Sequence, residues 1–424
     1  MLDFASGRGE TQNMWEKLRS GDWLDEERLR VYPVMLLLLA AGCVVAVLAT
    51  AKGRFDVNGH PLGTDFAQVW VAGLETLRGH PEAPFDLERH IAEQRVEFGA
   101  DSDVYGWHYP PFFLAPAAAL AHLPYLEALA VWQMATLALY LAAVLALMRG
   151  SAAPPWRVAL MALAFPATLV NLGHGQNGFL TAALLGFGFL SLRPRPALAG
   201  VCFALLAYKP QFALALPVAL VAGGHWRTLV AAAFSFLVMI TVSAIAFGPE
   251  SWIAFAQSLD VTRHLVVEQG AAGFTKIQSV FATARLLGAD IATAYAAQTL
   301  VTATTLVALV WLWRGHADDR VKAAGAIVAT FLTTPYCLDY DMTALAPAFA
   351  LLVSHGLERG FGPYMKSALA AAFVIPLVAR PIATALSLPL GAVTVAALYA
   401  TILSNARDAS FRHAGAIAGL RSAR

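Results

Sequence analysis

The chain has 424 residues, of which 58% are hydrophobic and 13% are charged, and its formal net charge is +1 at pH 7. Soluble proteins carry about 25% charged residues, so this composition and a mean hydropathy of +0.60 exclude an ordinary soluble domain. A net charge near zero gives no case for binding nucleic acid. Cys43, Cys202 and Cys337 lie in or near apolar runs and form no Cys-x-x-Cys pair, which favours neither a zinc site nor a disulfide framework.

The N-terminal apolar run could be a cleavable signal or a retained membrane span. Residues 1–30 are polar, and the apolar run 31–51 ends in Ala49-Thr50-Ala51, which is similar to a signal-peptidase site. A cleavable signal has an apolar region of roughly 7–15 residues. Because this run is longer, we interpret it as a retained membrane span.

Apolar runs of about 20 residues recur along the chain and are typical of transmembrane helices. A membrane barrel would instead show segments of about ten residues with alternating polarity. We therefore predict an all-α polytopic membrane protein with about 12 spans. The predicted spans are residues 31–51, 112–148, 156–173, 178–192, 196–208, 211–223, 226–248, 290–314, 320–335, 342–355, 365–380 and 387–404.

Three of these segments have lengths that do not fit one membrane crossing. The segment 112–148 is too long for one span, and we expect Pro124 to break it. The segments 196–208 and 211–223 are too short to cross about 30 Å alone. We expect them to form a broken or re-entrant pair that meets at Lys209-Pro210 and faces protein or water.

Lys and Arg residues predict the orientation, because they concentrate in cytoplasmic loops. The charge pattern places both termini in the cytoplasm of a multi-pass protein of the plasma (inner) membrane. We expect three parts: a cytoplasmic segment 1–30, a transmembrane domain 31–404 and a cytoplasmic tail 405–424. Within the transmembrane domain, loops 52–111 and 249–289 would face the outside or periplasm, and the first would carry short interfacial helices and the chemistry.

Asp65 follows Gly63-Thr64 and precedes a segment, Phe66 to Leu77, with apolar residues at helical spacing. One interpretation is that Asp65 only caps this helix, since Asp favours the N-cap position. The other is that it serves as a general base, because a carboxylate at a bilayer surface is partly desolvated. The residues alone leave both open.

Four cations could contact an anionic ligand. His108 stands in His108-Tyr109-Pro110-Pro111, which is either a simple helix entry or a segment that holds a phosphate or sugar hydroxyl. Lys209 lies between apolar half-helices, where an unpaired charge is costly. It therefore pairs with a carboxylate such as Asp65 or Asp339, or it meets a lipid phosphate. Arg263 and Lys276 belong to the loop 249–289. They are either ordinary polar residues of a loop or part of a mobile lid over a substrate.

A further set of polar residues could bind a sugar or an acceptor. Gln176 and Asn177 join two short helices, and this turn is either a tight hairpin or part of a sugar site. Two acids flanked by tyrosines suggest sugar recognition or, as a weaker option, a metal site without a third ligand. The residues that we expect to contact the sugar or the acceptor are Tyr109, Gln176, Asn177, Asp339, Tyr340 and Asp341.

The order of these motifs resembles glycosyltransferase family 87, a family of the GT-C superfamily of polytopic transferases. The resemblance covers roughly residues 30–405. It rests on an early outer-loop Asp with an amphipathic helix, then His-Tyr-Pro-Pro, Gly-Gln-Asn and Lys-Pro. One departure is that the late segment 335–341 contains no His, where mannosyltransferase members often carry one.

The resemblance implies a GT-C-like bundle that takes a hexose, mannose foremost, from a polyprenyl-phosphate sugar. The sugar would pass to a lipid or glycan acceptor on the outer face, with inversion and without a metal or other cofactor. Asp65 would be the base. A cation should stabilise the departing phosphate, and Lys209 is our first choice, followed by His108, Arg263 and Lys276.

Two other functions use similar features. A lipid or sugar transporter or flippase would also have broken helices, but it predicts repeated halves that the sequence does not show. A polysaccharide polymerase or ligase using a polyprenyl-diphosphate donor would favour a large late outer loop, whereas here the first outer loop is the larger. A structural or assembly subunit is a further alternative.

Overall fold

The computed structural model describes residues 14–212 and 214–422, with side chains up to residue 408. The predicted segments 1–30 and 405–424 therefore lie only partly within the described residues. The α-helices are α2 (Glu26–Thr50), α3 (Phe66–Leu77), α4 (Leu87–Phe98), α5 (Leu114–Ala121), α6 (Tyr125–Leu147), α7 (Pro155–Ala164), α8 (Pro166–His174), α9 (Gly178–Ser191), α10 (Pro196–Leu205), α11 (Ala215–Ala222), α12 (Trp226–Phe247), α13 (Pro249–Thr262), α14 (Val280–Leu286), α15 (Ile291–Arg314), α16 (Asp319–Leu332), α17 (Ala346–Arg359), α18 (Met365–Leu386) and α19 (Leu390–Ser422). The short helices are the 3-10 helices η1 (Ala83–Phe85), η2 (Pro111–Phe113), η3 (Leu206–Tyr208), η4 (Pro210–Phe212) and η6 (Asp339–Leu345), and the π-helix η5 (Arg263–Glu268).

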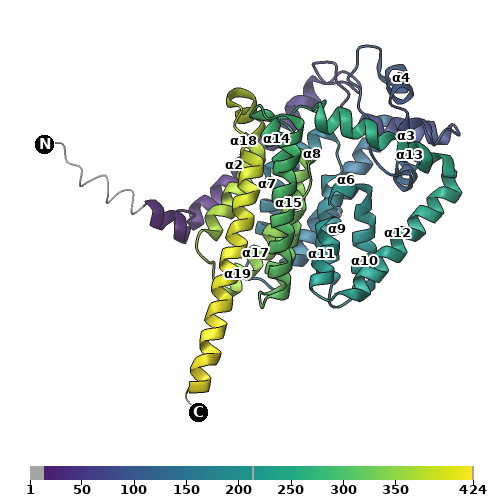
Figure 1. Ribbon diagram of the computed structural model, residues 1–424. Helices are drawn as coiled ribbons and strands as arrows, with labels where there is room; N and C mark the ends of the chain where they lie inside the picture. The colour runs from purple at the N-terminus through teal and green to yellow at the C-terminus, as the bar shows by residue number, and fades with distance from the viewer. Residues whose placement is uncertain (1–13, 213, 423–424) are drawn as a thin grey trace.

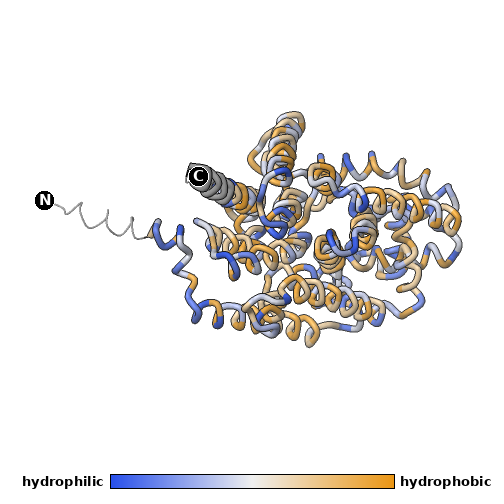
Figure 2. Tube along the Cα trace, turned by 90° about the horizontal axis from the view of Figure 1, so that it is seen from below, coloured by the Kyte–Doolittle hydropathy of each residue, from blue (hydrophilic) through white to orange (hydrophobic). Residues whose placement is uncertain are grey.

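The described residues form helices without any strand, and apolar residues predominate along them (Figure 2), which confirms the predicted helical membrane class. Within the described part of the chain, 5 helices are long and apolar enough to cross a membrane, or 6 if a bent pair counts as one span. The best 18-residue windows of α2 and α12 are only 6% buried. Such exposure of apolar side chains fits helices that face lipid. The predicted number of twelve spans stays a prediction.

The two expected interruptions are present. The segment 112–148 divides into α5 and α6, and Pro124 stands at the N-terminal boundary of α6. The pair α10–η3 and η4–α11 meets at Lys209, whose non-helical backbone, with φ −119° and ψ 79°, separates the two 3-10 turns. Both breaks precede or contain a proline, whose ring and missing N–H disfavour a continuing helix.

Three predicted segments differ in detail from the observed helices. The segment 156–173 is bent by 57° between α7 and α8, because Phe165 takes an extended backbone before Pro166. In the segment 342–355, the α-helix begins only at Ala346, because the preceding residues belong to the 3-10 helix η6. The last helix continues past 404 to Ser422, since residues 405–414 contain neither Pro nor Gly.

The structure has two ends, which Figure 1 separates clearly. The loop 52–111 carries α3, η1 and α4, and the loop 249–289 carries α13, η5 and α14. These helices lie together at one end, which we call the loop end. The turns from α11 to α12 and from α15 to α16 lie at the opposite end.

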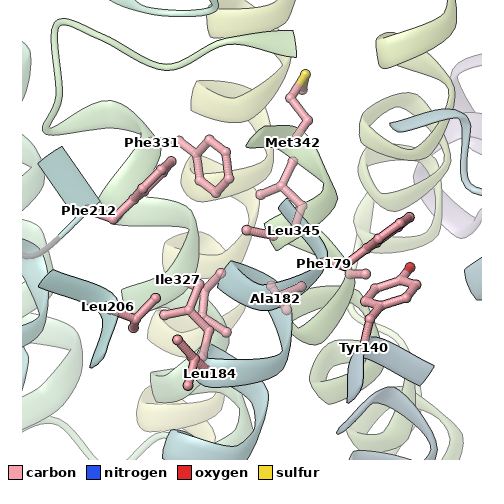
Figure 3. Packing of buried hydrophobic residues seen from close by; sticks show 14 of the residues in the cluster. Tyr140, Phe179, Ala182, Leu184, Leu206, Phe212, Ile327, Phe331, Met342 and Leu345 are labelled. Carbon is pink, nitrogen blue, oxygen red and sulfur yellow. The ribbon is translucent and has the colours of Figure 1, made fainter. Parts of the chain in front are cut away.

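The buried core lies between these ends. In Figure 3, Phe212 from η4 and Phe331 from α16 face each other, with ring centroids 5.4 Å apart. Tyr140 from α6 packs against Phe179 from α9 at 5.4 Å. Met342, from η6, is fully buried beside them. These contacts hold the broken helices and η6 against the rest of the bundle.

Helix α3, which has the predicted bounds, packs closely on α5. A Cβ atom added at Gly73 would lie 2.1 Å from the carbonyl oxygen of Ala117 and 2.7 Å from the Cβ of Ala121. Only glycine therefore permits this contact without displacing a backbone, and this contact holds the loop 52–111 on the bundle.

We expect Gly73→Ala to lower the free energy of unfolding by about 1–3 kcal/mol, because the extra methyl group overpacks this contact. Thermal unfolding in detergent measures the change. The matched control is Gly42→Ala on α2, where an added Cβ meets nothing within 4 Å. Equal stability of the two variants would contradict the packing argument.

Candidate functional site

Asp65 stands at the start of α3, but its side chain makes no capping hydrogen bond. Its Oδ2 instead accepts a hydrogen bond from Nε2 of Gln176, at 2.9 Å. The side chain is 13% exposed. The capping role that the sequence left open is therefore not realised, and the carboxylate faces the segment after α8.

His174 approaches the same carboxylate. Its Nδ1 lies 2.9 Å from the hydroxyl oxygen of Thr64 and 3.9 Å from Oδ1 of Asp65. Gly175 ends α8 in the left-handed conformation, with φ +62°. A Cβ there would lie 2.8 Å from the carbonyl oxygen of Gly63 and 2.6 Å from Phe66. Glycine thus lets the end of α8 touch the loop that carries Asp65.

Gln176 links Asp65 to Tyr109. The Tyr109 hydroxyl donates to Oε1 of Gln176 at 3.2 Å, while Nε2 of the same amide donates to Asp65. Burial, followed by the charges of Asp65 and Asp341, raises the pKa of Tyr109 above its usual 10.0. The hydroxyl therefore stays protonated and can donate near neutral pH.

Asn177 offers an unused acceptor beside this link. The residue is 2% exposed, and among the described residues its Oδ1 has no hydrogen-bond partner. Buried polar atoms are usually satisfied. An unsatisfied acceptor next to Gln176 is thus well placed for a ligand hydroxyl.

The sequence left open whether Lys209 pairs with a carboxylate, such as Asp65 or Asp339, or meets a lipid phosphate. In the structure it forms a buried ion pair with a carboxylate, that of Asp341. Oδ2 of Asp341 also accepts from the backbone N–H of Leu338 at 2.9 Å, and Nζ of Lys209 lies 5.0 Å from the centroid of the Tyr340 ring. A buried charge needs such a partner to be tolerated. The structure therefore gives Lys209 a carboxylate partner inside the protein.

Asp339 lies on the other side of Tyr340, among cations. Its Oδ2 is 3.9 Å from a guanidinium nitrogen of Arg380 in α18. Burial raises the pKa of Asp339, and the nearby His174, Arg380 and Lys276 act against that rise. Lys276 also reaches this place through its backbone, because its carbonyl oxygen accepts from the N–H of Asp339 at 3.1 Å.

Sequence reasoning missed Arg380 and His174. The signal for Arg380 was available: it is a single ionisable residue between Pro376 and Pro381 in an apolar helix, and such residues mark function by default. His174 belonged to the polar turn that we noticed, but we selected only the two amides after it.

Two of the four candidate cations lie apart from this cluster. Nδ1 of His108 bonds to the Thr262 hydroxyl at 2.9 Å, and burial together with His90 lowers the pKa of His108 to about 4. It is therefore uncharged at neutral pH. Arg263 pairs with Glu268 at 3.2 Å and Asp260 at 3.4 Å on the surface.

The loop end thus brings together residues from distant parts of the chain. Tyr336 and Tyr340 both lie within the electrostatic influence of Asp65 and of Asp341. The cluster contains Asp65, Tyr109, His174, Gln176, Asn177, Lys209, Lys276, Asp339, Tyr340, Asp341 and Arg380. Within the described residues, no three His, Cys, Asp or Glu side chains are arranged to hold a metal ion.

Comparison with known protein families identifies the chain's family. A sequence model of glycosyltransferase family 87 matches residues 107–337, which is more than half of the chain. The match includes Tyr109, Gln176 and Lys209, and it leaves Asp65 and Arg380 outside. No curated protein and no solved structure matches the chain.

The ion pair of Lys209 and Asp341 can be tested by stability. Lys209→Met leaves a buried carboxylate without its partner, so we expect the free energy of unfolding to fall by about 3–5 kcal/mol. Adding Asp341→Asn removes that charge and keeps an acceptor for the N–H of Leu338, so the double variant should recover part of the loss. Thermal unfolding in detergent measures both. If the loss of stability in the double variant equals the sum of the losses in Lys209→Met and Asp341→Asn measured separately, the two residues do not interact.

Proposed function

The chain belongs to glycosyltransferase family 87, and from this we propose that it transfers a hexose, mannose foremost, from a polyprenyl-phosphate sugar to a hydroxyl of a lipid or glycan acceptor. We place the reaction at the loop end, on the outer face of the plasma membrane. Membership in the family favours this transferase over a transporter or a structural subunit.

The observation that carries the proposal is the orientation of Asp65. Its side chain does not cap α3, and Gln176 holds one of its oxygens while the other faces His174 at 3.9 Å. A general base must present a free oxygen within hydrogen-bond reach of the acceptor hydroxyl. Oδ1 of Asp65, which Gln176 does not hold, is suited to this role in a mostly enclosed position.

The cations around Asp339 supply the second requirement. As the anomeric carbon leaves the donor, negative charge develops on the phosphate, and fixed positive groups there lower the barrier. Arg380 and Lys276 are suited to this task, because they flank an acid whose pKa is already raised by burial. Lys209 forms an ion pair with Asp341 and would then orient Asp341 toward the sugar.

The proposed reaction balances as follows. Asp65 accepts the proton of the acceptor hydroxyl, and the acceptor oxygen forms a bond to the anomeric carbon. The bond from that carbon to the phosphate oxygen breaks, and its electron pair leaves with the polyprenyl phosphate near Arg380 and Lys276. Attack and departure on opposite faces of the sugar invert the anomeric centre.

The remaining polar groups would bind the sugar between these two positions. The Asn177 Oδ1 is an unsatisfied acceptor, and the Tyr109 hydroxyl stays protonated. Together with Gln176, Tyr340 and the acids of η6, they offer both donors and acceptors to sugar hydroxyls. The donor's polyprenyl chain is apolar, which suits an enzyme made almost entirely of apolar helices.

Asp65→Asn tests the proposed base directly. The amide keeps the shape but cannot accept the proton, so we expect transfer from labelled polyprenyl-phosphate mannose to fall about 100-fold or more. The measurement uses membranes with equal amounts of inserted protein. The matched control is Asp101→Asn, an exposed acid on the same loop, which should retain wild-type transfer. Activity of Asp65→Asn equal to that of the control would remove Asp65 from the mechanism.

Arg380→Gln tests the proposed phosphate contact. We expect kcat/KM for the donor to fall about tenfold or more, because a fixed charge next to the leaving group is lost. Arg380→Lys should restore part of this loss, and the KM for the acceptor should stay unchanged. Arg314→Gln, at the opposite end of the bundle, is the control. An unchanged donor response in Arg380→Gln would place the phosphate elsewhere.

A further inference from the structure

A cavity lies at the end of the bundle opposite the candidate site. Its volume is about 280 Å³. The ends of α9, α11 and α15 and the start of α16 form it, and the turns between these helices lie together at the lower end of Figure 1. Its main polar and aromatic lining residues are Arg193, His225, Trp313, Asp319 and Lys322.

The aromatic wall of this cavity is rigidly held. Trp313 is 4% exposed, and its indole N–H donates to the carbonyl oxygen of Lys322 at 3.0 Å. Its ring meets His225 edge-on at 5.7 Å and Phe189 at 6.3 Å. A Cβ at Gly223 would lie 2.5 Å from the Trp313 ring, so glycine is needed for this close approach. The cavity is thus built in advance of any ligand.

The charges around the cavity are predominantly positive. Arg193 and Lys322 line it together with one acid, Asp319, whose Oδ1 accepts from Arg193 at 2.7 Å. Burial lowers the pKa of His225, and Arg193 and Lys322 lower it further while Asp319 opposes them. Lys322 has no carboxylate partner among the ion pairs of the described side chains. An anion would supply one.

An apolar surface begins directly beside the cavity. His225 is followed by Trp226 and Arg227, which with Val230 and Phe234 line a shallow groove on α12. This helix is one of the least buried in the protein, and Phe234 is 68% exposed. In a bilayer, such an exposed apolar helix contacts the hydrocarbon chains of lipids.

We propose that this cavity binds the phosphate of a phospholipid headgroup from the leaflet at that end, with Lys322 and Arg193 as its cations and the groove on α12 under an acyl chain. Trp313 and His225 form the wall against the headgroup. The lipid would add a further contact among α9, α11, α15 and α16 at this end of the bundle. This proposal is independent of the transferase reaction.

The experiment measures phospholipid binding rather than activity. Delipidated protein in detergent is titrated with phosphatidylglycerol, and native mass spectrometry counts the bound lipid. We expect one tight site in the wild type and an affinity about tenfold weaker in Lys322→Gln, since the charge-assisted hydrogen bond from Lys322 to the phosphate is lost. Arg193→Gln, a change at an exposed residue, provides a second variant with the same expected direction.

Arg195→Gln is the matched control, because Arg195 lies in the same turn, is exposed and does not line the cavity. It should bind phosphatidylglycerol as the wild type does. Equal binding by the wild type and both cavity variants, or equal weakening in the control, would overturn the proposal. A parallel titration with sn-glycerol 3-phosphate shows whether the cavity prefers the phosphate of a lipid or that of a soluble molecule. Equally tight binding of this soluble phosphate would overturn the assignment to a lipid.

Discussion

A charged side chain can be buried in this protein only where another part of the chain brings it a partner, and the loop end is organised by that constraint. Lys209 interrupts two half-helices and would be costly to bury alone. Asp341, which belongs to η6 and lies more than a hundred residues later in the chain, forms an ion pair with Lys209. To reach Lys209, η6 must lie across the broken helices, and this position also places Asp339 and Tyr340 beside His174.

The remaining contacts follow from close approach at a few small residues. Gly73 lets α3 pack on α5, and Gly175 lets the end of α8 meet the loop that carries Asp65. The Gln176 amide then holds Asp65 and Tyr109 in one network. The proposed base, Asp65, and the proposed phosphate cations, Arg380 and Lys276, are thus held by the protein before any substrate arrives, and charges fixed in this way lower a barrier without reorganisation.

Much of this could be predicted from local sequence, because local signals determine local structure. The bounds of α3, the breaks at Pro124 and Lys209, the helical membrane class and the family were all confirmed. Partners distant in the chain were not predictable in the same way. Both Asp339 and Asp341 were visible, but only the turn of η6 decides which of them faces Lys209. The bend at Pro166 was missed because an apolar run on both sides reads as one helix, and Arg380 was missed because the helix around it is otherwise apolar.

In the proposed mechanism, the donor phosphate and the base that activates the acceptor occupy opposite sides of one site. The most direct test is a structure with a non-transferable phosphonate analogue of a polyprenyl-phosphate sugar. We expect the phosphonate beside Arg380 and Lys276, with the anomeric carbon between it and Asp65. A phosphonate bound at Arg263, or an anomeric carbon that faces away from Asp65, would contradict it.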